Sequence, residues 1–163
     1  FVLPEPFIPK TGARVMSLLD PSSKMSKSEQ GGDGCITLME SPDDIMRSFR
    51  RAVTDSDTCV RFDPENKPGV SNLMTIYSCA AGKSFEEIEN EFAGRGYGEF
   101  KQAVGESVVE LLRPIREKTQ DLLNNRDYLE GIYAKGAERA ARLAQKTLDK
   151  VYRKVGFVPA RRG

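Results

Sequence analysis

Apolar and polar positions follow a helical period over most of the chain from residue 41 onward. The segment SPDDIMRSFRRAV, residues 41–53, opens with Ser41, a proline and two acidic residues, and arginines gather toward its end. A serine cap, an early proline, acids in the first turn and bases in the last are typical of an α-helix. One face of this helix is predicted to point into the core, and it carries Ile45, Met46, Phe49 and Val53.

The same signals predict further helices along the rest of the chain. We expect them at about residues 70–81 with a stop at Gly82, after Ser84 as a cap, at 99–124 with Pro114 inside, and at 127–155 with a stop at Gly156. The run Cys59–Phe62 is the strand-like stretch between them. Residues 1–34 hold several prolines and glycines and are expected to form loop, with a short extended piece around Val15–Leu19. The pattern predicts a mainly α fold.

The last predicted helix has two different faces. At about 100° per residue, an apolar sector is predicted to pack and holds Leu129, Tyr133, Ala137, Ala140, Ala144, Leu148, Val151 and Val155. A wedge about 80° wide on nearly the opposite side holds Lys135, Arg139, Arg142, Lys146, Lys150 and Arg153. Residues 126–163 carry +6, and the preceding residues carry −5. Such a stripe is more often plain solvated surface than a contact for nucleic acid, and both interpretations stay open.

The residue types present limit the kinds of catalysis and metal binding open to this chain. The chain contains no histidine, which excludes Ser-His-Asp and Cys-His catalysis. Its three cysteines, Cys35, Cys59 and Cys79, are widely spaced without a zinc pattern, suit a reducing cytoplasm, and are expected to pack as small hydrophobic side chains. Asp55 and Asp57 suggest either a cation site or a capped turn, and the lack of further ligands favours the turn. No metal site is predicted.

Two further features concern the chain as a whole. No apolar run approaches 18 residues, so no membrane-spanning helix is predicted. The sequence begins at Phe1 rather than at methionine, and we expect it to be a piece of a longer polypeptide.

The stretch PSSKMSKSEQGGDG, residues 21–34, carries the clearest candidate chemistry. Lys24 and Lys27 can reach one small anion from a loosely turned loop, and Ser26, Ser28 and backbone amides add shorter contacts. Such a loop can stabilise charge on phosphate oxygens without transferring protons. A lysine pair at this spacing is, by itself, more often an ordinary surface loop.

The pentapeptide KMSKS and its surroundings change that balance. KMSKS resembles the second signature of class I aminoacyl-tRNA synthetases. The segments IPKTGARVMSLLDPSSKMSKS, AVTDSDTCVRFDPENKPGVSNLMTIYS, GYGEFK and LLRPI resemble, in the same order, the carboxyl-terminal half of bacterial tryptophanyl-tRNA synthetases. The similarity runs from Phe1 to about Phe157.

The resemblance implies the reaction of a tryptophan-tRNA ligase. Such a ligase activates L-tryptophan with ATP and Mg²⁺, releases pyrophosphate, and transfers the aminoacyl group to tRNA(Trp). It implies that Lys24 and Lys27 are catalytic, that Val15, Met25, Ser26 and Ser28 complete the ATP-binding set, and that glycines 31, 32 and 34 form a hinge. It also implies a cytoplasmic, homodimeric full-length protein. The basic stripe from Lys135 to Arg153 then either contacts tRNA phosphates or covers the outside of a helix packed on the missing half of the protein.

The resemblance also sets the expected fold and domains. It implies a helical domain of the anticodon-binding type, with an edge remnant of a Rossmann-like nucleotide-binding domain. The expected divisions are a catalytic remnant at 1–34, the helical domain at 35–125, and a basic carboxyl-terminal helix and tail at 126–163.

Two departures limit what the resemblance implies for this chain. The signature is followed by Glu29 and Gln30, where the family usually has aspartate and often proline. The H-I-G-H-type tetrapeptide of the first signature is missing, so the fragment alone is expected to be inactive. The alternatives are a free-standing helical RNA-binding or scaffolding module, and the related tyrosine-specific ligase, whose signature usually lacks MSKS.

Overall fold

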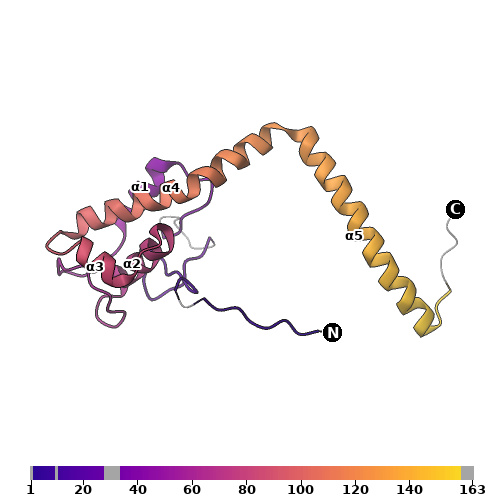
Figure 1. Ribbon diagram of the computed structural model, residues 1–163, viewed down its shortest axis with the longest axis horizontal. Helices are drawn as coiled ribbons and strands as arrows, with labels where there is room; N and C mark the ends of the chain where they lie inside the picture. The colour runs from indigo at the N-terminus through magenta and orange to yellow at the C-terminus, as the bar shows by residue number, and fades with distance from the viewer. Residues whose placement is uncertain (1, 10, 28–33, 159–163) are drawn as a thin grey trace. The chain divides into compact units, whose positions relative to one another are not determined.

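The computed structural model describes residues 2–9, 11–27 and 34–158 (Figure 1). Its regular structure in those ranges is helical, which confirms the mainly α prediction. The helices are α1 (Pro42–Arg51), α2 (Pro68–Ala81), α3 (Phe85–Glu91), α4 (Tyr97–Asn124) and α5 (Arg126–Val155). The chain divides into two compact units, Phe1–Arg116 and Glu117–Gly163.

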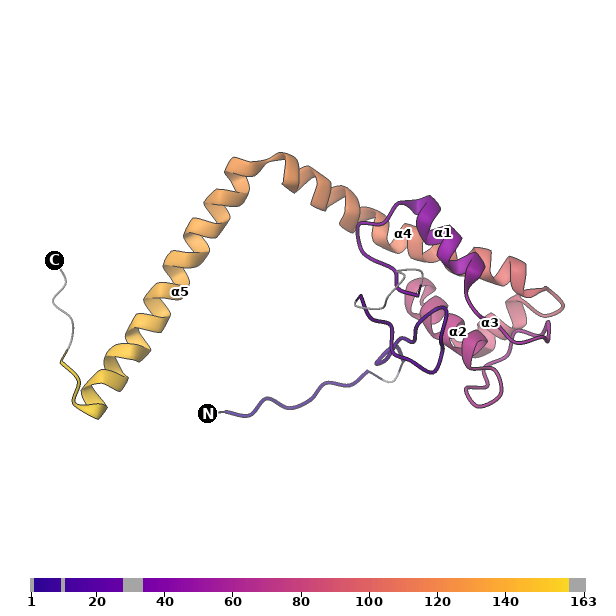
Figure 2. The same ribbon diagram turned by 180° about the vertical axis from the view of Figure 1, so that it is seen from behind.

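In the first unit, α1, α2 and α3 pack against the first part of α4 (Figures 1 and 2). Three aromatic rings meet edge to face in its core. The Phe100 ring of α4 lies 6.2 Å from that of Tyr77 on α2 and 5.1 Å from that of Phe92, the residue directly after α3. Edge-to-face rings add stabilisation beyond the area they bury. This core fixes α2, the helix that supports the candidate site.

The helix ends follow the residues that the sequence marks as caps. Ser41 Oγ accepts the amide of Asp44 at 3.1 Å, and Ser84 forms a reciprocal capping box with Glu87. Gly82 and Gly156 end α2 and α5 in the left-handed conformation, with φ of 69° and 77°. These four end signals are confirmed because each depends on residues within one turn of the helix end.

Three local predictions are wrong. Val53 is 44% exposed, because α1 ends at Arg51 and the Val53 amide instead donates to the Leu18 carbonyl at 2.8 Å. The run Cys59–Phe62 does not form a strand in the part of the chain described, and the Phe62 amide donates to the Glu89 carboxylate at 2.8 Å. Cys59 is exposed rather than packed in the core, as is Cys79.

The second unit consists mainly of α5. Within the described residues, α5 has no buried side chain. Of the eight residues in the apolar sector predicted to pack, Leu129 is half-buried and the other seven are exposed. Val151 and Val155, for example, are 47% and 56% exposed. None of the described helices has the length and apolar character needed to cross a membrane.

Gly69 allows α2 to lie directly against the loop that follows α1. A Cβ atom at this position would lie 2.2 Å from the carbonyl oxygen of Val53, which is backbone and cannot swing away. The same stretch of loop donates the Val53 amide to Leu18. The close approach at Gly69 therefore holds the amino-terminal segment near α2.

We expect Gly69→Ala to lower the free energy of unfolding by about 2–3 kcal/mol, because the added methyl forces backbone apart. Gly98→Ala is the matched control, since nothing lies within 4 Å of its added Cβ and it is also in the first turn of a helix. The control should be neutral or stabilise by up to about 1 kcal/mol. Urea denaturation of both variants measures the difference, and equal midpoints would contradict the packing described.

Candidate functional site

The predicted lysine loop grows out of a short antiparallel pairing. The Ser17 amide donates to the Ser23 carbonyl at 2.8 Å, and the Met25 amide donates to the Val15 carbonyl at 3.0 Å. Met16 and Lys24 face each other between these two hydrogen bonds. We call residues 15–25 the hairpin. It brings together three of the predicted site residues, namely Val15, Lys24 and Met25.

Asp20 closes the turn of the hairpin. Its Oδ1 accepts the Ser22 amide at 3.1 Å and the Ser22 hydroxyl at 2.6 Å, and its Oδ2 accepts the Ser23 hydroxyl at 2.5 Å. These hydrogen bonds from Ser22 and Ser23 lower the pKa of the Asp20 carboxyl, because they favour its charged form. The turn therefore reverses the chain directly before Lys24.

Leu18 attaches the hairpin to the rest of the first unit. Its side chain is 1% exposed. Its amide donates to the Gly34 carbonyl at 2.9 Å, and its carbonyl accepts the Val53 amide at 2.8 Å. A buried apolar side chain with both backbone groups paired leaves the base of the hairpin little freedom to move.

The two predicted catalytic lysines extend from this fixed base. Lys24 and Lys27 are exposed, Ser26 is exposed, and Met25 is partly buried against the core. Among the described residues, no carboxylate lies within ion-pair distance of either ammonium group. Both charges are thus available for an external anion. Ser28 and glycines 31 and 32 lie outside the described residues, so the predicted hinge stays a prediction.

The predicted tRNA-binding residues lie on α5, in the second unit. All six are exposed, as expected of a contact face, and they are Lys135, Arg139, Arg142, Lys146, Lys150 and Arg153. Exposure alone suits both a solvated face and a nucleic-acid contact.

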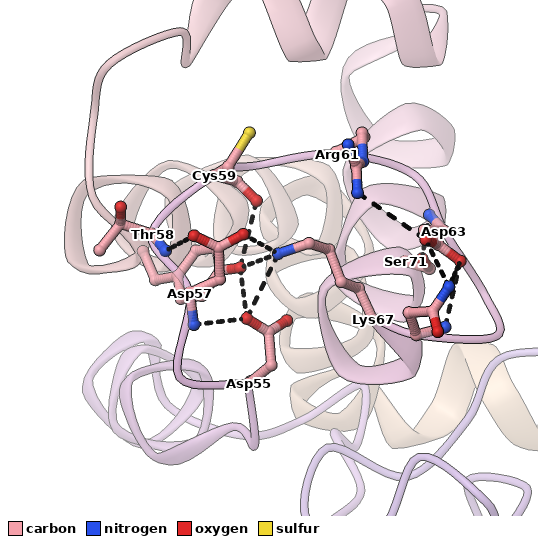
Figure 3. A network of polar contacts seen from close by, with 10 residues as sticks. Asp55, Asp57, Thr58, Cys59, Arg61, Asp63, Lys67 and Ser71 are labelled. Atoms are coloured by element: carbon pink, nitrogen blue, oxygen red, sulfur yellow. Dashed lines mark hydrogen bonds and ion pairs between the residues drawn. The ribbon is translucent and has the colours of Figure 1, made fainter.

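Asp55 and Asp57 belong to a polar cluster around Lys67, the residue before α2 (Figure 3). The Lys67 ammonium lies 2.7 Å from Asp57 Oδ2 and 3.4 Å from Asp55 Oδ1, and it donates to the Tyr97 hydroxyl at 3.0 Å. The Asp57 amide also donates to Asp55 Oδ1 at 2.8 Å. A lysine ammonium therefore occupies the place of a metal ion. The described residues include no group of three or more potential metal ligands.

The cluster shifts the pKa of each of its charged members. The hydrogen bond from Lys67 lowers the pKa of Asp57 below its usual value of 3.8. Burial alone raises the pKa of Asp55, but hydrogen bonds from Tyr97, the Asp57 amide and Lys67 lower it overall. Hydrogen bonds to Asp57 and Tyr97 raise the pKa of Lys67. All three groups are charged at neutral pH, and together they hold the loop 52–67 to the start of α2 and α4.

Asn72, which no motif in the sequence singles out, contacts the hairpin from α2. Its side-chain amide makes two hydrogen bonds of 2.9 Å with the backbone of Met16. The sequence does hold one indication of a special role for Asn72. Asparagine is disfavoured in helix interiors, and Asn72 lies among apolar positions of a predicted helix. A buried amide requires partners, but the sequence does not tell which segment supplies them.

Comparisons with known proteins agree on one family. The family model described as tRNA synthetases class I (W and Y) matches residues 1–113. The tryptophan–tRNA ligase of Halalkalibacterium halodurans is 47% identical over 99% of this chain and 49% of its own length. The corresponding protein of Bacillus anthracis is 49% identical with the same coverage. The chain thus spans about half the length of the curated relatives it matches.

Solved structures give the same result. Tryptophanyl-tRNA synthetase from Mycoplasma pneumoniae superposes with a TM-score of 0.78 at 29% identity, over 92% of this chain and 45% of that one. The enzyme from Campylobacter jejuni, complexed with ADP and tryptophan, gives 0.66 at 29% identity, over 86% of this chain and 44% of that one.

We expect Lys67→Met to cost about 3 kcal/mol of stability, because it leaves the Asp55 carboxylate without its cation in a site of low exposure. The Lys67 side chain is 6% exposed and that of Asp55 24%. Lys83→Met is a matched control, since its ammonium also meets a carboxylate, Glu91 at 2.7 Å, and a tyrosine hydroxyl, but its side chain is 38% exposed. The control should cost less than about 1 kcal/mol.

The ion pairs of Lys67 with Asp55 and Asp57 predict how the stability of the protein depends on pH. Folding lowers the pKa of Asp57 and Asp55, so the stability they contribute is present above their usual value of 3.8 and is lost as the pH falls below it. The unfolding midpoints of the wild type and of Lys67→Met should therefore converge below that pH. A difference between them that stays constant from pH 7 to pH 3 would contradict the coupling.

Proposed function

The chain belongs to the class I tRNA synthetases of the W and Y family, and on this premise we propose that it supplies part of a tryptophan-tRNA ligase. In this proposal residues 1–34 contribute the ATP-phosphate loop, residues 35–125 form a helical region on the anticodon side, and residues 126–163 add a basic helix. The substrates are ATP, L-tryptophan and tRNA(Trp). The complete enzyme is expected to be a cytoplasmic homodimer.

The hairpin is the observation that supports this assignment most strongly. It holds Lys24 opposite Met16 by backbone hydrogen bonds, beside Val15, while the ammonium groups of Lys24 and Lys27 remain exposed and without carboxylate partners among the described residues. Neighbouring ammonium groups on a fixed base suit a polyphosphate, whose charge they neutralise as point charges with several donors each. A purely solvated lysine loop does not require a base held so firmly.

The proposed chemistry follows from where charge develops. A tryptophan carboxylate oxygen attacks the α-phosphorus of ATP, and the bond to the bridging oxygen between the α- and β-phosphates breaks. The electron pair of that bond leaves with diphosphate, so negative charge grows on the leaving group. Lys24 and Lys27 stabilise that charge by position and electrostatics alone. Mg²⁺ enters with ATP as part of the substrate.

The remaining ATP contacts in the proposal come from the backbone of Val15, from the packing of Met25 and from two serines. Val15 is partly buried, and its carbonyl accepts the Met25 amide, so we propose that its backbone N–H meets the nucleotide. Met25 packs partly against the core and is proposed to guide the loop as it closes. Ser26 and Ser28 supply further donors. The proposed edge remnant of a nucleotide-binding domain lies in this same segment.

We expect Lys24→Ala and Lys27→Ala, made in the complete enzyme that carries this chain, each to slow ATP–pyrophosphate exchange by about 100- to 1,000-fold, as for loss of one oxyanion donor. Lys118→Ala is the control, because Lys118 is exposed and paired only with Asp121 among the described residues. Exchange at the wild-type rate in both loop variants would overturn the proposed role. It would favour the alternative of a helical RNA-binding module that kept the signature without its chemistry.

The stripe on α5 makes a separate prediction about tRNA. If Arg142, Lys146 and Arg153 contact phosphates, replacing all three with alanine should weaken tRNA(Trp) binding and reduce the slope of log affinity against log salt by about 2–3. The rate of pyrophosphate exchange, which involves no tRNA, should stay unchanged. A salt slope equal to that of the wild type would assign the stripe to plain solvated surface.

A further inference from the structure

The pairing of Met16 with Lys24 leaves the backbone of Met16 with a second, open edge. In an antiparallel pair the hydrogen bonds on either side of a non-bonded position are made by its neighbours, here Ser17 and Val15. The N–H and C=O groups of Met16 itself therefore point away from Lys24. Such groups need partners when they are partly buried.

Asn72 fills this edge. Its Oδ1 accepts the Met16 amide at 2.9 Å, and its Nδ2 donates to the Met16 carbonyl at 2.9 Å. A carboxamide offers the same donor and acceptor as a peptide group, so Asn72 continues the ladder as a neighbouring strand would. Lys24 and Asn72 thus lie on opposite edges of Met16.

The helix that carries Asn72 is packed into the core of the first unit. Val70, Leu73 and Met74, which flank Asn72 on α2, are 0–1% exposed, and Asn72 itself is 6% exposed. Side chains packed at this density cannot shift without opening the core. The position of α2 is therefore transmitted through Asn72 to Met16, and from Met16 to the backbone of Lys24.

We infer that Asn72 is a positioning residue that holds Lys24 where it meets the leaving diphosphate, acting through the backbone of Met16. The inference rests on the proposed function for its chemical consequence. Asn72 does not touch the nucleotide in this account. It fixes the base of the hairpin, so that the backbone of Lys24 keeps one position.

A positioning role for Asn72 can be distinguished from a purely structural role by a control residue that affects stability alone. Ser71 provides the comparison, because it is the adjacent residue on α2, is 4% exposed, and also accepts a backbone amide, that of Asp63 at 2.9 Å. It therefore resembles Asn72 in burial and chemistry but holds a segment remote in sequence from the hairpin. Ser71→Ala is the matched control for loss of stability alone.

The first measurement is amide hydrogen exchange in the complete enzyme. Asn72→Leu is close in size and removes both hydrogen bonds, whereas Asn72→Asp keeps an acceptor for the Met16 amide and loses the donor. Peptides covering residues 15–25 should exchange about tenfold faster or more in Asn72→Leu. Asn72→Asp should give an intermediate rate, and Ser71→Ala the wild-type rate. Unchanged exchange in Asn72→Leu would overturn the inference.

The second measurement is a kinetic cycle by pyrophosphate exchange. Asn72→Leu should lower kcat by about 10- to 100-fold, as for a small misplacement of a catalytic group, while the KM for tryptophan changes little. In a Lys24→Ala background the same substitution should cost less than about twofold, because the group it positions is gone. An equal loss in both backgrounds, or an equal loss in Ser71→Ala, would overturn the inference.

The two proposals can fail separately in this design. If Lys24→Ala itself exchanges pyrophosphate at the wild-type rate, the proposed function fails, and with it the catalytic purpose assigned to Asn72. If Lys24→Ala is slow but Asn72→Leu is as fast as the wild type, the lysine role stands and the positioning role is overturned.

Discussion

The hydrogen-bonded pairing of residues 15–17 with residues 23–25 is the constraint on which the account depends. A loop that meets a polyphosphate must bring cations to it, and free lysines on a loose chain lose conformational entropy each time they do so. Here the base of the loop is ordered in advance. Leu18 is buried, Asp20 closes the turn, and the backbone of Met16 is hydrogen-bonded to Asn72 on the edge away from Lys24, so the backbone position of Lys24 is set before an anion binds. This is preorganisation applied to the base of a loop.

The helical unit supports that constraint. The aromatic core formed around Phe100 fixes α2, Gly69 lets α2 approach the loop after α1, and Lys67 ties the same loop to the starts of α2 and α4. None of these groups bears an assigned chemical role. Their common effect is to keep Asn72 in place beneath the hairpin. The hairpin and the helices α1 to α3 are far apart in the sequence but belong to one compact unit, residues 1–116.

The features that sequence analysis predicted well are those decided within a few residues. Ser41, Ser84, Gly82 and Gly156 mark helix ends because a cap needs only its own turn, and KMSKS indicates the family because the signature lies in five adjacent residues. Contacts between residues far apart in the sequence could not be predicted from it. Asn72 meets Met16 across 56 positions, and Asp55 meets Tyr97 across 42. The solvent exposure of α5 also could not be predicted, because a helical period indicates an apolar face without saying whether the same unit covers it.

Methyl resonances of the methionines give the most direct test of a fixed base and a responsive loop. In the complete enzyme labelled with ¹³C at the methionine methyl groups, titration with magnesium pyrophosphate should shift the signal of Met25 in a saturable way. The signals of Met16, at the base of the hairpin, and of Met74, buried in α2, should stay in place. A Met25 signal unmoved at saturating pyrophosphate, or shifts of equal size at Met74, would contradict the account.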